Sequence, residues 1–206
     1  MDEHDFMSGC NSEKKAFERL LDDLVAAGLD KSMTVLMDQV EHILKTEQKL
    51  TDYDPIQPVT DLEPTRACLE AIHCLASHTH LVLGAADKHT VEVFYAEIGL
   101  RFYATFTKHL KTMQVSEQGG FRLISDLNAY YEWAASLGVS EASKYFGALK
   151  ELGHIYVVSP TNLRDLMHDA NRYRGVIGVE EIYEFVQLRK DYRKIKTMVD
   201  DKCTFM

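Results

Sequence analysis

The chain has 206 residues, a net charge of −9, 46% hydrophobic residues and 27% charged residues. These values are typical of a globular protein with a buried core, and they exclude an intrinsically disordered chain. The acidic balance disfavours nucleic acid as a partner, because a phosphate backbone requires a basic face.

Targeting and redox signals point to a reducing, cytosolic setting. No run approaches the roughly 18 consecutive apolar residues of a membrane-spanning helix. The acidic N-terminus, Met1–Asp5, lacks the apolar segment of a signal peptide. The cysteines show neither C-x-x-C spacing nor a pattern that indicates a disulfide framework. They are Cys10, Cys68, Cys74 and Cys203.

The first half of the chain predicts four helices and one long loop. Apolar residues recur at three- and four-residue spacing, and Gly28 is expected to end the first helix. The segment 50–64 contains Pro55, Pro58 and Pro64, which predicts a loop. The predicted helices are 13–27, 31–49, 65–83 and 89–113.

The second half predicts four more helices. Ser116–Gly120 breaks the pattern, Gly138 ends a helix, and Ser159-Pro160 has the cap and first-turn residues of another. Residues 154–158 are the one candidate strand. The predicted helices are 121–137, 140–157, one beginning at 159 and one beginning near 179. We therefore expect an all-α fold of elongated, stacked helical bundles, with domains at 1–116, which include the Pro-rich loop 50–64, and at 117–206.

No catalytic pattern emerges from the sequence. The phosphate-binding, dinucleotide-binding and serine-hydrolase motifs are missing, and Trp133 beside Tyr130 and Tyr131 is typical of a bundle core. One region is rich in metal-ligand types, but it has neither H-E-x-x-H nor paired-cysteine spacing, so we expect buried thiols and surface imidazoles there. Its residues are Cys68, His73, Cys74, His78, His80 and His89. We predict no catalytic residue, no metal and no cofactor.

The last four residues, Cys203-Thr204-Phe205-Met206, match the C-a-a-X pattern for prenylation in its farnesyl-favouring form. In this interpretation the Cys203 thiolate attacks an isoprenoid diphosphate, and the chain gains a lipid anchor. The alternative is a cysteine that lies near the end by chance.

A basic segment precedes this cysteine, with six basic and three acidic residues between 189 and 202. One lipid chain binds membranes only marginally, and basic residues add roughly 1 kcal/mol each near an anionic surface. We therefore predict a membrane-facing basic surface, with a solvated helix face as the alternative. Its residues are Arg189, Lys190, Arg193, Lys194 and Lys196.

Four segments between Thr65 and Lys196 also carry a resemblance to known proteins. They are Val93–Phe102, Gly119-Gly120 with Leu123–Tyr130, Phe146–Val158 and Tyr183–Tyr192. Their order and spacing resemble the C-terminal end of the exocyst complex component five (Sec-ten) family and of its relatives, the recyclins, which are fungal F-box proteins of endocytic recycling. The first 64 residues match less clearly.

The resemblance implies a non-enzymatic trafficking scaffold or tether of the rod type, peripheral on endosomal, Golgi or plasma membrane. It implies trafficking proteins as partners, such as a Rab-type GTPase or a SNARE, beside an anionic membrane surface. The C-a-a-X ending favours recyclin, and an F-box, with its own partner, would then lie upstream of this chain. The alternatives are the substrate-capturing part of an F-box ubiquitin-ligase adaptor, the C-terminal domain of an exocyst subunit, and a metal-dependent or hydrolytic enzyme.

Overall fold

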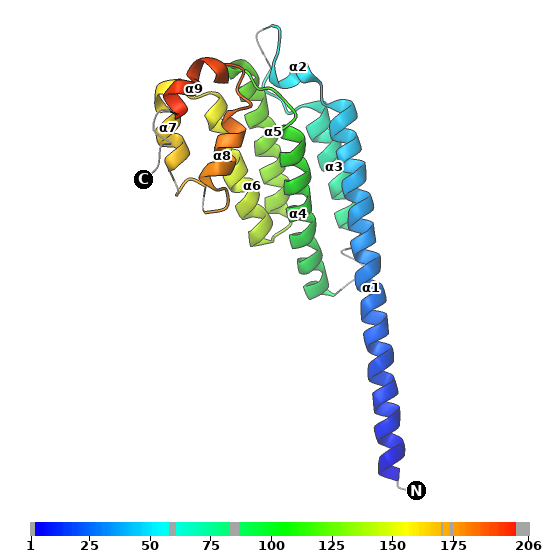
Figure 1. The fold of residues 1–206 in the computed structure, drawn as a ribbon. Coiled ribbons are helices and arrows are strands. Elements are labelled where there is room, and N and C mark those ends of the chain that lie inside the picture. Colours follow the sequence, from blue (N-terminus) through cyan, green and yellow to red (C-terminus); the bar gives the residue numbers. More distant parts are fainter. Residues whose placement is uncertain (1–2, 58–60, 83–86, 170, 174, 201–206) are drawn as a thin grey trace. The chain divides into compact units, whose positions relative to one another are not determined.

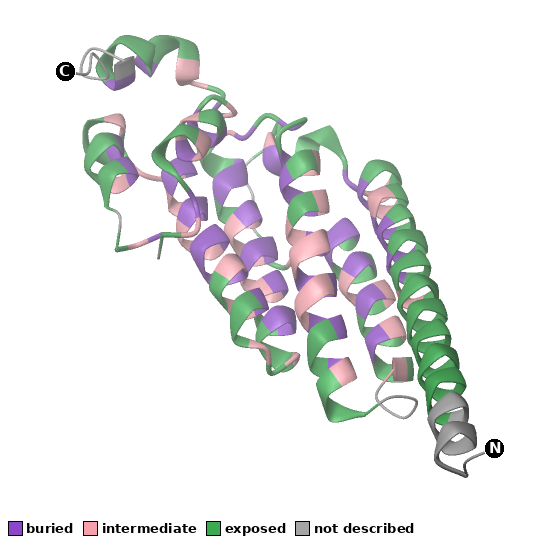
Figure 2. Cartoon of the chain, turned by 60° about the horizontal axis from the view of Figure 1, so that its bottom comes forward, coloured by how far each residue is buried: buried purple, intermediate pink, exposed green. Residues whose placement is uncertain are grey.

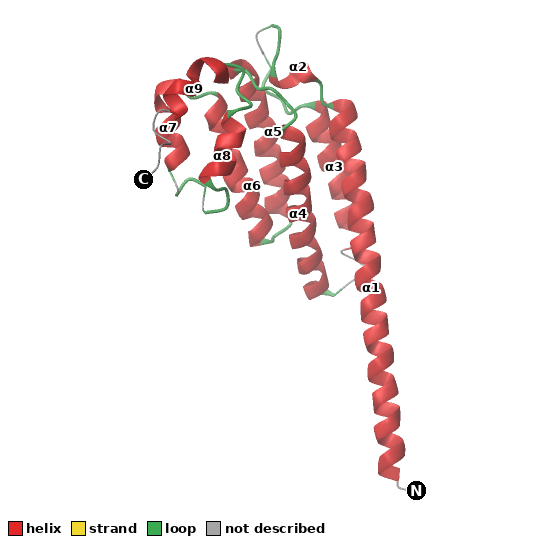
Figure 3. Ribbon diagram, viewed as in Figure 1, coloured by secondary structure: helices red, strands yellow, loops and turns green. Residues whose placement is uncertain are grey.

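The computed structural model describes residues 3–57, 61–82, 87–169, 171–173 and 175–200. Within those ranges every regular element is a helix, as Figure 1 and Figure 3 show, which confirms the predicted all-α class. The elements are α1 (Glu3–Glu47), α2 (Leu50–Tyr53), α3 (Arg66–Val82), α4 (Lys88–Leu110), α5 (Glu117–Ser136), α6 (Ser140–Leu152), the 3₁₀ turn η1 (Gly153–Tyr156), α7 (Pro160–His168), α8 (Val179–Val186) and α9 (Tyr192–Asp200).

The chain divides into two compact units, Met1–Leu36 and Met37–Met206. In the first unit, five apolar side chains of α1 lie on one helical face and are between 45% and 61% exposed. They are Phe17, Leu20, Leu21, Leu24 and Val25. The helical periodicity of this segment was thus predictable, whereas the exposure of its apolar face was not. The expected domain boundary at residue 116 stays a prediction.

The predicted break at Gly28 is wrong, because α1 runs through it without interruption. A glycine ends a helix by adopting a left-handed conformation, and the glycines with positive φ among the described residues are Gly138 and Gly175. In a helix interior a glycine costs only about 1 kcal/mol relative to alanine, which flanking helix formers tolerate. At Gly138 (φ of 71°) the predicted helix end is confirmed, one residue after the cap of α5.

The core of the second unit is an aromatic cluster shared by α4, α5 and α6. Phe102 of α4 lies 5.1 Å from Tyr130, 5.4 Å from Trp133 and 5.4 Å from Phe146, measured between ring centroids. All four side chains are buried, and Figure 2 shows the buried faces of these helices turned toward one another. Edge-on and offset ring pairs stabilise the folded state beyond the contribution from burying their apolar surface. The prediction that Tyr130 and Trp133 belong to the core is confirmed.

The expected last helix is two helices, α8 and α9, with residues 187–191 between them. In this segment Val115 donates its N–H to the Leu188 carbonyl at 2.9 Å, and Lys190 donates its own to the Val115 carbonyl at 2.8 Å. These two backbone bonds form the isolated bridge between Val115 and Arg189. They replace the helical bonds that the periodicity had predicted. Residues 154–158, the candidate strand, contain part of η1 instead.

The adjacent glycines of α5 are required by close packing rather than by backbone conformation. A Cβ atom on Gly119 would lie 1.8 Å from the Tyr53 carbonyl oxygen, and one on Gly120 would lie 2.9 Å from the Tyr156 Cβ. The N-terminal turn of α5 therefore touches the backbone of the last residue of α2 on one side and η1 on the other. Ser116 caps the helix by accepting the Gly119 N–H at 3.2 Å.

We predict that Gly119→Ala destabilises the chain by at least about 3 kcal/mol, because the new methyl group collides with backbone that cannot rotate away. Urea unfolding measures this loss. Gly28→Ala is the matched control, since an alanine there meets nothing within 4 Å and removes the helix-interior cost of glycine. Equal stability of the two variants would contradict the close packing at Gly119.

Candidate functional site

Arg189 does not belong to the predicted membrane-facing surface, because it is only 4% exposed. Its guanidinium donates to the carbonyls of Ile155 and Val158 and forms two bonds of 2.8 Å with the Asp191 carboxylate. Bonding to Arg189 is also the main reason that the pKa of Asp191 is lowered. Arg189 thus fixes the end of η1 against the segment before α9, and its charge is satisfied inside the protein.

Lys190 is exposed, but its ammonium lies 2.7 Å from the Asp54 carboxylate. This ion pair joins the loop after α2 to the segment before α9. About half of the lysine side chain remains open to solvent, at 56%. Lys190 is therefore partly neutralised where the sequence predicted a fully available charge.

The remaining three predicted basic residues share the outer side of α9. Arg193, Lys194 and Lys196 are exposed, whereas Ile195 and Val199 are buried. We call these three basic residues the α9 basic surface. Helix α9 packs against α7, so its apolar side is covered and its basic side is open. Cys203 lies outside the described residues.

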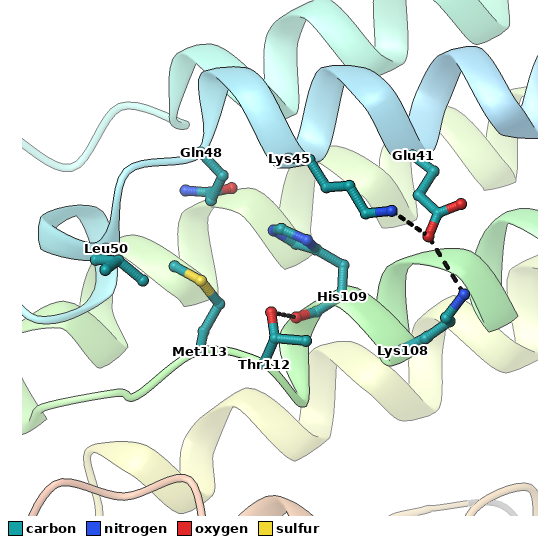
Figure 4. A pocket seen from close by; sticks show the side chains of 8 residues that line it. All are labelled: Glu41, Lys45, Gln48, Leu50, Lys108, His109, Thr112 and Met113. Carbon is teal, nitrogen blue, oxygen red and sulfur yellow. Dashed lines mark hydrogen bonds and ion pairs between the residues drawn. The ribbon is translucent and has the colours of Figure 1, made fainter.

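A pocket of about 380 Å³ opens between α1 and α4 in the second unit (Figure 4). At one end Glu41 accepts hydrogen bonds from both Lys45, at 2.9 Å, and Lys108, at 3.2 Å. Bonds to these two ammonium groups lower the pKa of Glu41. The sequence predicted no site here, because Glu41 and Lys108 are 67 residues apart. The residues that line the pocket are Glu41, Lys45, Gln48, Leu50, Lys108, His109, Thr112 and Met113.

His109 lies in the middle of this pocket wall. Its Nε2 atom is buried and has no hydrogen-bond partner. Burial, aided by the nearby Lys45 ammonium, lowers the pKa of the imidazole. The ring is therefore neutral at pH 7 and retains an unused hydrogen-bonding atom.

Neither a metal cluster nor a membrane span is found in the part of the chain that the structure describes. No three His, Cys, Asp or Glu side chains there come close enough to hold a metal ion. Of the residues that suggested such a site, Cys68 is buried, Cys74 is half-buried, and His73, His80 and His89 are exposed. No described helix is long and apolar enough to cross a membrane.

Comparison with known proteins decides the family. The model of the family described as "Exocyst complex component Sec10-like, alpha-helical bundle" matches residues 1–200. The chain belongs to this family. The match includes the first 64 residues, for which the sequence alone showed a less clear resemblance.

Several curated relatives agree with this membership. The chain is 36% identical to Recyclin-1 of Saccharomyces cerevisiae over 205 residues, which cover 95% of this chain and 24% of that protein. It is 36% identical to F-box protein pof6 of Schizosaccharomyces pombe over 195 residues, covering 92% of this chain and 22% of that protein. It is 27% identical to human Exocyst complex component 5 over 191 residues, which cover 92% of this chain and 27% of that protein. The chain thus spans about a quarter of the length of these relatives.

Asp126, one of the residues that carried the resemblance, is the centre of a buried hydrogen-bond network in this Sec10-like bundle. Its carboxylate accepts bonds from the Tyr53 hydroxyl at 2.6 Å, the Thr65 N–H at 2.6 Å and the Thr65 hydroxyl at 2.7 Å. The Cys68 thiol lies 3.7 Å from the Asp126 carbonyl oxygen. A cysteine, a tyrosine and a carboxylate side by side resemble catalytic machinery, so their protonation states decide the interpretation.

The protonation states favour a structural role for this network. Burial raises the pKa of the Cys68 thiol and of the Tyr53 hydroxyl far above neutrality, so neither supplies an anionic nucleophile. Burial also raises the pKa of Asp126 to about 6, although the bonds from Tyr53 and Thr65 act in the opposite direction. The sequence identified Asp126 as part of a motif, but its partners lie 61 and 73 residues away.

We predict that Asp126→Asn changes how stability depends on pH. The folded pKa is above the unfolded value of 3.8, so protonated Asp126 favours folding, and this contribution declines as pH rises from about 4 to 6. A shift of this size corresponds to about 3 kcal/mol. The wild type should therefore lose about that much stability relative to Asp126→Asn between pH 4 and 7, as measured by urea unfolding. A pH-independent difference between the two proteins would contradict the raised pKa.

Proposed function

We propose that this chain is a non-enzymatic scaffold of vesicle trafficking, acting in endocytic recycling or exocytosis as one region of a longer tethering protein. The observation that carries the proposal is the match of residues 1–200 to the Sec10-like exocyst family. The names of the relatives, a recyclin and exocyst components, support the same field of function. Burial keeps the Cys68 thiol and the Tyr53 hydroxyl of the Asp126 network protonated, so neither supplies an anionic nucleophile, which supports a non-enzymatic role.

The second part of the proposal is attachment to a membrane through two weak signals. Prenylation at Cys203 supplies one apolar chain, which alone binds a bilayer marginally. The α9 basic surface supplies attraction to anionic lipids, and Lys190 contributes once its pair with Asp54 opens. The protein would then be peripheral on endosomal, Golgi or plasma membrane.

Protein partners complete the proposed role. A scaffold of this family would hold other trafficking proteins near the bilayer, and a Rab-type GTPase or a SNARE is the class of partner that we propose. The net charge of −9 argues against nucleic acid.

A second role rests on the relative that is named as an F-box protein. In a longer protein with an F-box, this bundle would capture the substrate of a ubiquitin ligase. The C-terminal domain of an exocyst subunit is the remaining alternative. The upstream sequence of the same open reading frame distinguishes them, because an F-box there favours the recyclin type.

We predict that Cys203→Ser shifts the protein from the membrane fraction to the soluble fraction of cells. The serine cannot form the thioether to an isoprenoid, so the apolar anchor is lost. Fractionation followed by immunoblotting measures the distribution, and Cys74→Ser serves as the control because that thiol lies on α3 and outside the C-a-a-X sequence. An unchanged distribution of Cys203→Ser would remove the lipid anchor from the proposal.

We also predict that replacing Arg193, Lys194 and Lys196 by Glu weakens binding to anionic vesicles by at least about a hundredfold, at roughly 1 kcal/mol per basic residue lost. The difference should shrink in 0.5 M salt, because ions screen exposed charges. A flotation assay with vesicles of phosphatidylcholine and phosphatidylserine measures binding.

The matched control replaces three basic residues on α1, α4 and α6, Lys14, Lys88 and Lys144, by Glu. This control has the same net charge as the α9 variant. If both variants lose the same affinity, the effect comes from total charge, and the α9 basic surface is only a solvated helix face.

A further inference from the structure

The pocket between α1 and α4 has two chemically different ends. Figure 4 shows Glu41, Lys45 and Lys108 at one end and Leu50 with Met113 at the other, with His109 between them. Leu50 is 73% exposed, which leaves an apolar side chain at the rim with open space beside it. Met113 is 5% exposed and lies deeper in the wall.

The charged end carries an excess of one positive charge, because two ammonium groups share the single carboxylate of Glu41. The side chains of Lys45 and Lys108 are 63% and 75% exposed, so each can reach outward without uncovering buried surface. An ammonium has three donors, and the bond to Glu41 uses one of them. A second carboxylate can therefore bind to both lysines.

The middle of the pocket offers one more polar contact. The His109 Nε2 atom is buried and unpartnered, although a buried polar atom without a partner ordinarily costs free energy. A neutral imidazole in the tautomer with its proton on Nε2 donates a hydrogen bond. Because this atom is closed to solvent, a carbonyl or carboxylate that enters the pocket would satisfy it only after the imidazole turns toward the pocket.

We propose that this pocket binds a short acidic peptide segment of a partner protein. An Asp or Glu carboxylate binds Lys45 and Lys108, and a neighbouring apolar side chain lies on Leu50 and Met113. Once its ring turns toward the pocket, His109 donates from Nε2 to an oxygen of the same segment. Charge complementarity selects the acidic residue, and the exposed apolar rim selects its neighbour. This site is separate from the α9 basic surface and requires neither Cys203 nor a membrane.

The test uses the 206-residue chain and a fluorescein-labelled peptide of sequence Gly-Ser-Asp-Leu-Glu-Leu-Ser-Gly. Fluorescence anisotropy in 50 mM salt measures its binding. Two further peptides separate the two ends of the pocket: one has Asn and Gln in place of the acids, and one has Ser in place of both Leu. We expect both to bind more weakly than the first.

The protein variant Lys45→Gln with Lys108→Gln should weaken binding of the acidic peptide about fivefold or more, from the loss of two partly exposed ion pairs. The matched control is Lys88→Gln with Lys144→Gln, which has the same net charge and leaves the pocket intact, and its affinity should not change. Thermal unfolding of each variant establishes that the fold is kept.

A site-specific signal locates the bound peptide. In protein labelled with ¹³C at the methionine methyl groups, the Met113 signal, assigned through Met113→Leu, should shift on titration with the acidic peptide. Three results would overturn the proposal: no binding at 1 mM peptide, equal loss in the two lysine variants, or binding that leaves the Met113 signal unmoved. None of them bears on membrane attachment, because the α9 basic surface and Cys203 are untouched.

Discussion

The second unit depends on one buried carboxylate. Asp126 is fully buried in α5 and accepts three short hydrogen bonds, from Tyr53 and from the backbone and side chain of Thr65. An isolated buried charge would be strongly destabilising, so the carboxylate is tolerated only because three hydrogen bonds fill its acceptors. The two donor residues lie on either side of the loop between α2 and α3. One side chain therefore positions both ends of that loop against α5.

A second set of contacts begins next to the first and extends toward the C-terminal helices. Ser116 donates its N–H to the Tyr53 carbonyl at 2.9 Å, and its neighbour Val115 forms the backbone bridge to the segment between α8 and α9. Gly119 leaves the space in which this backbone packs. The orientation of the α9 basic surface thus depends on hydrogen bonds that start more than 70 residues earlier in the sequence.

Local patterns predicted most of the helices but few of the contacts between them. Periodicity predicted α3 to α6, and local chemistry predicted the Ser159 cap and the end of α5 at Gly138. The same reasoning failed at Gly28, where the cost of glycine is too small to end a helix, and at residues 187–191, where pairing with Val115 replaces helical bonds. The prediction that Arg189 faces a membrane was wrong. The carbonyls that its guanidinium binds belong to residues more than 30 positions away, so no local pattern reveals its burial. The α1–α4 pocket could not be predicted for the same reason: Glu41 and Lys45 are neighbours on one helix, but Lys108 comes from another.

The attachment of both ends of the α2–α3 connection to Asp126 has a practical consequence for protein engineering. Lengthening a loop whose ends are already held adds only a slowly growing entropic cost, about 0.6 kcal/mol for each doubling. Additional residues placed after Ile56, which is 91% exposed, would leave the hydrogen bonds of Tyr53 and Thr65 in place. A fluorescent reporter or an affinity tag could therefore be inserted there, and the chain's own termini would remain free for study.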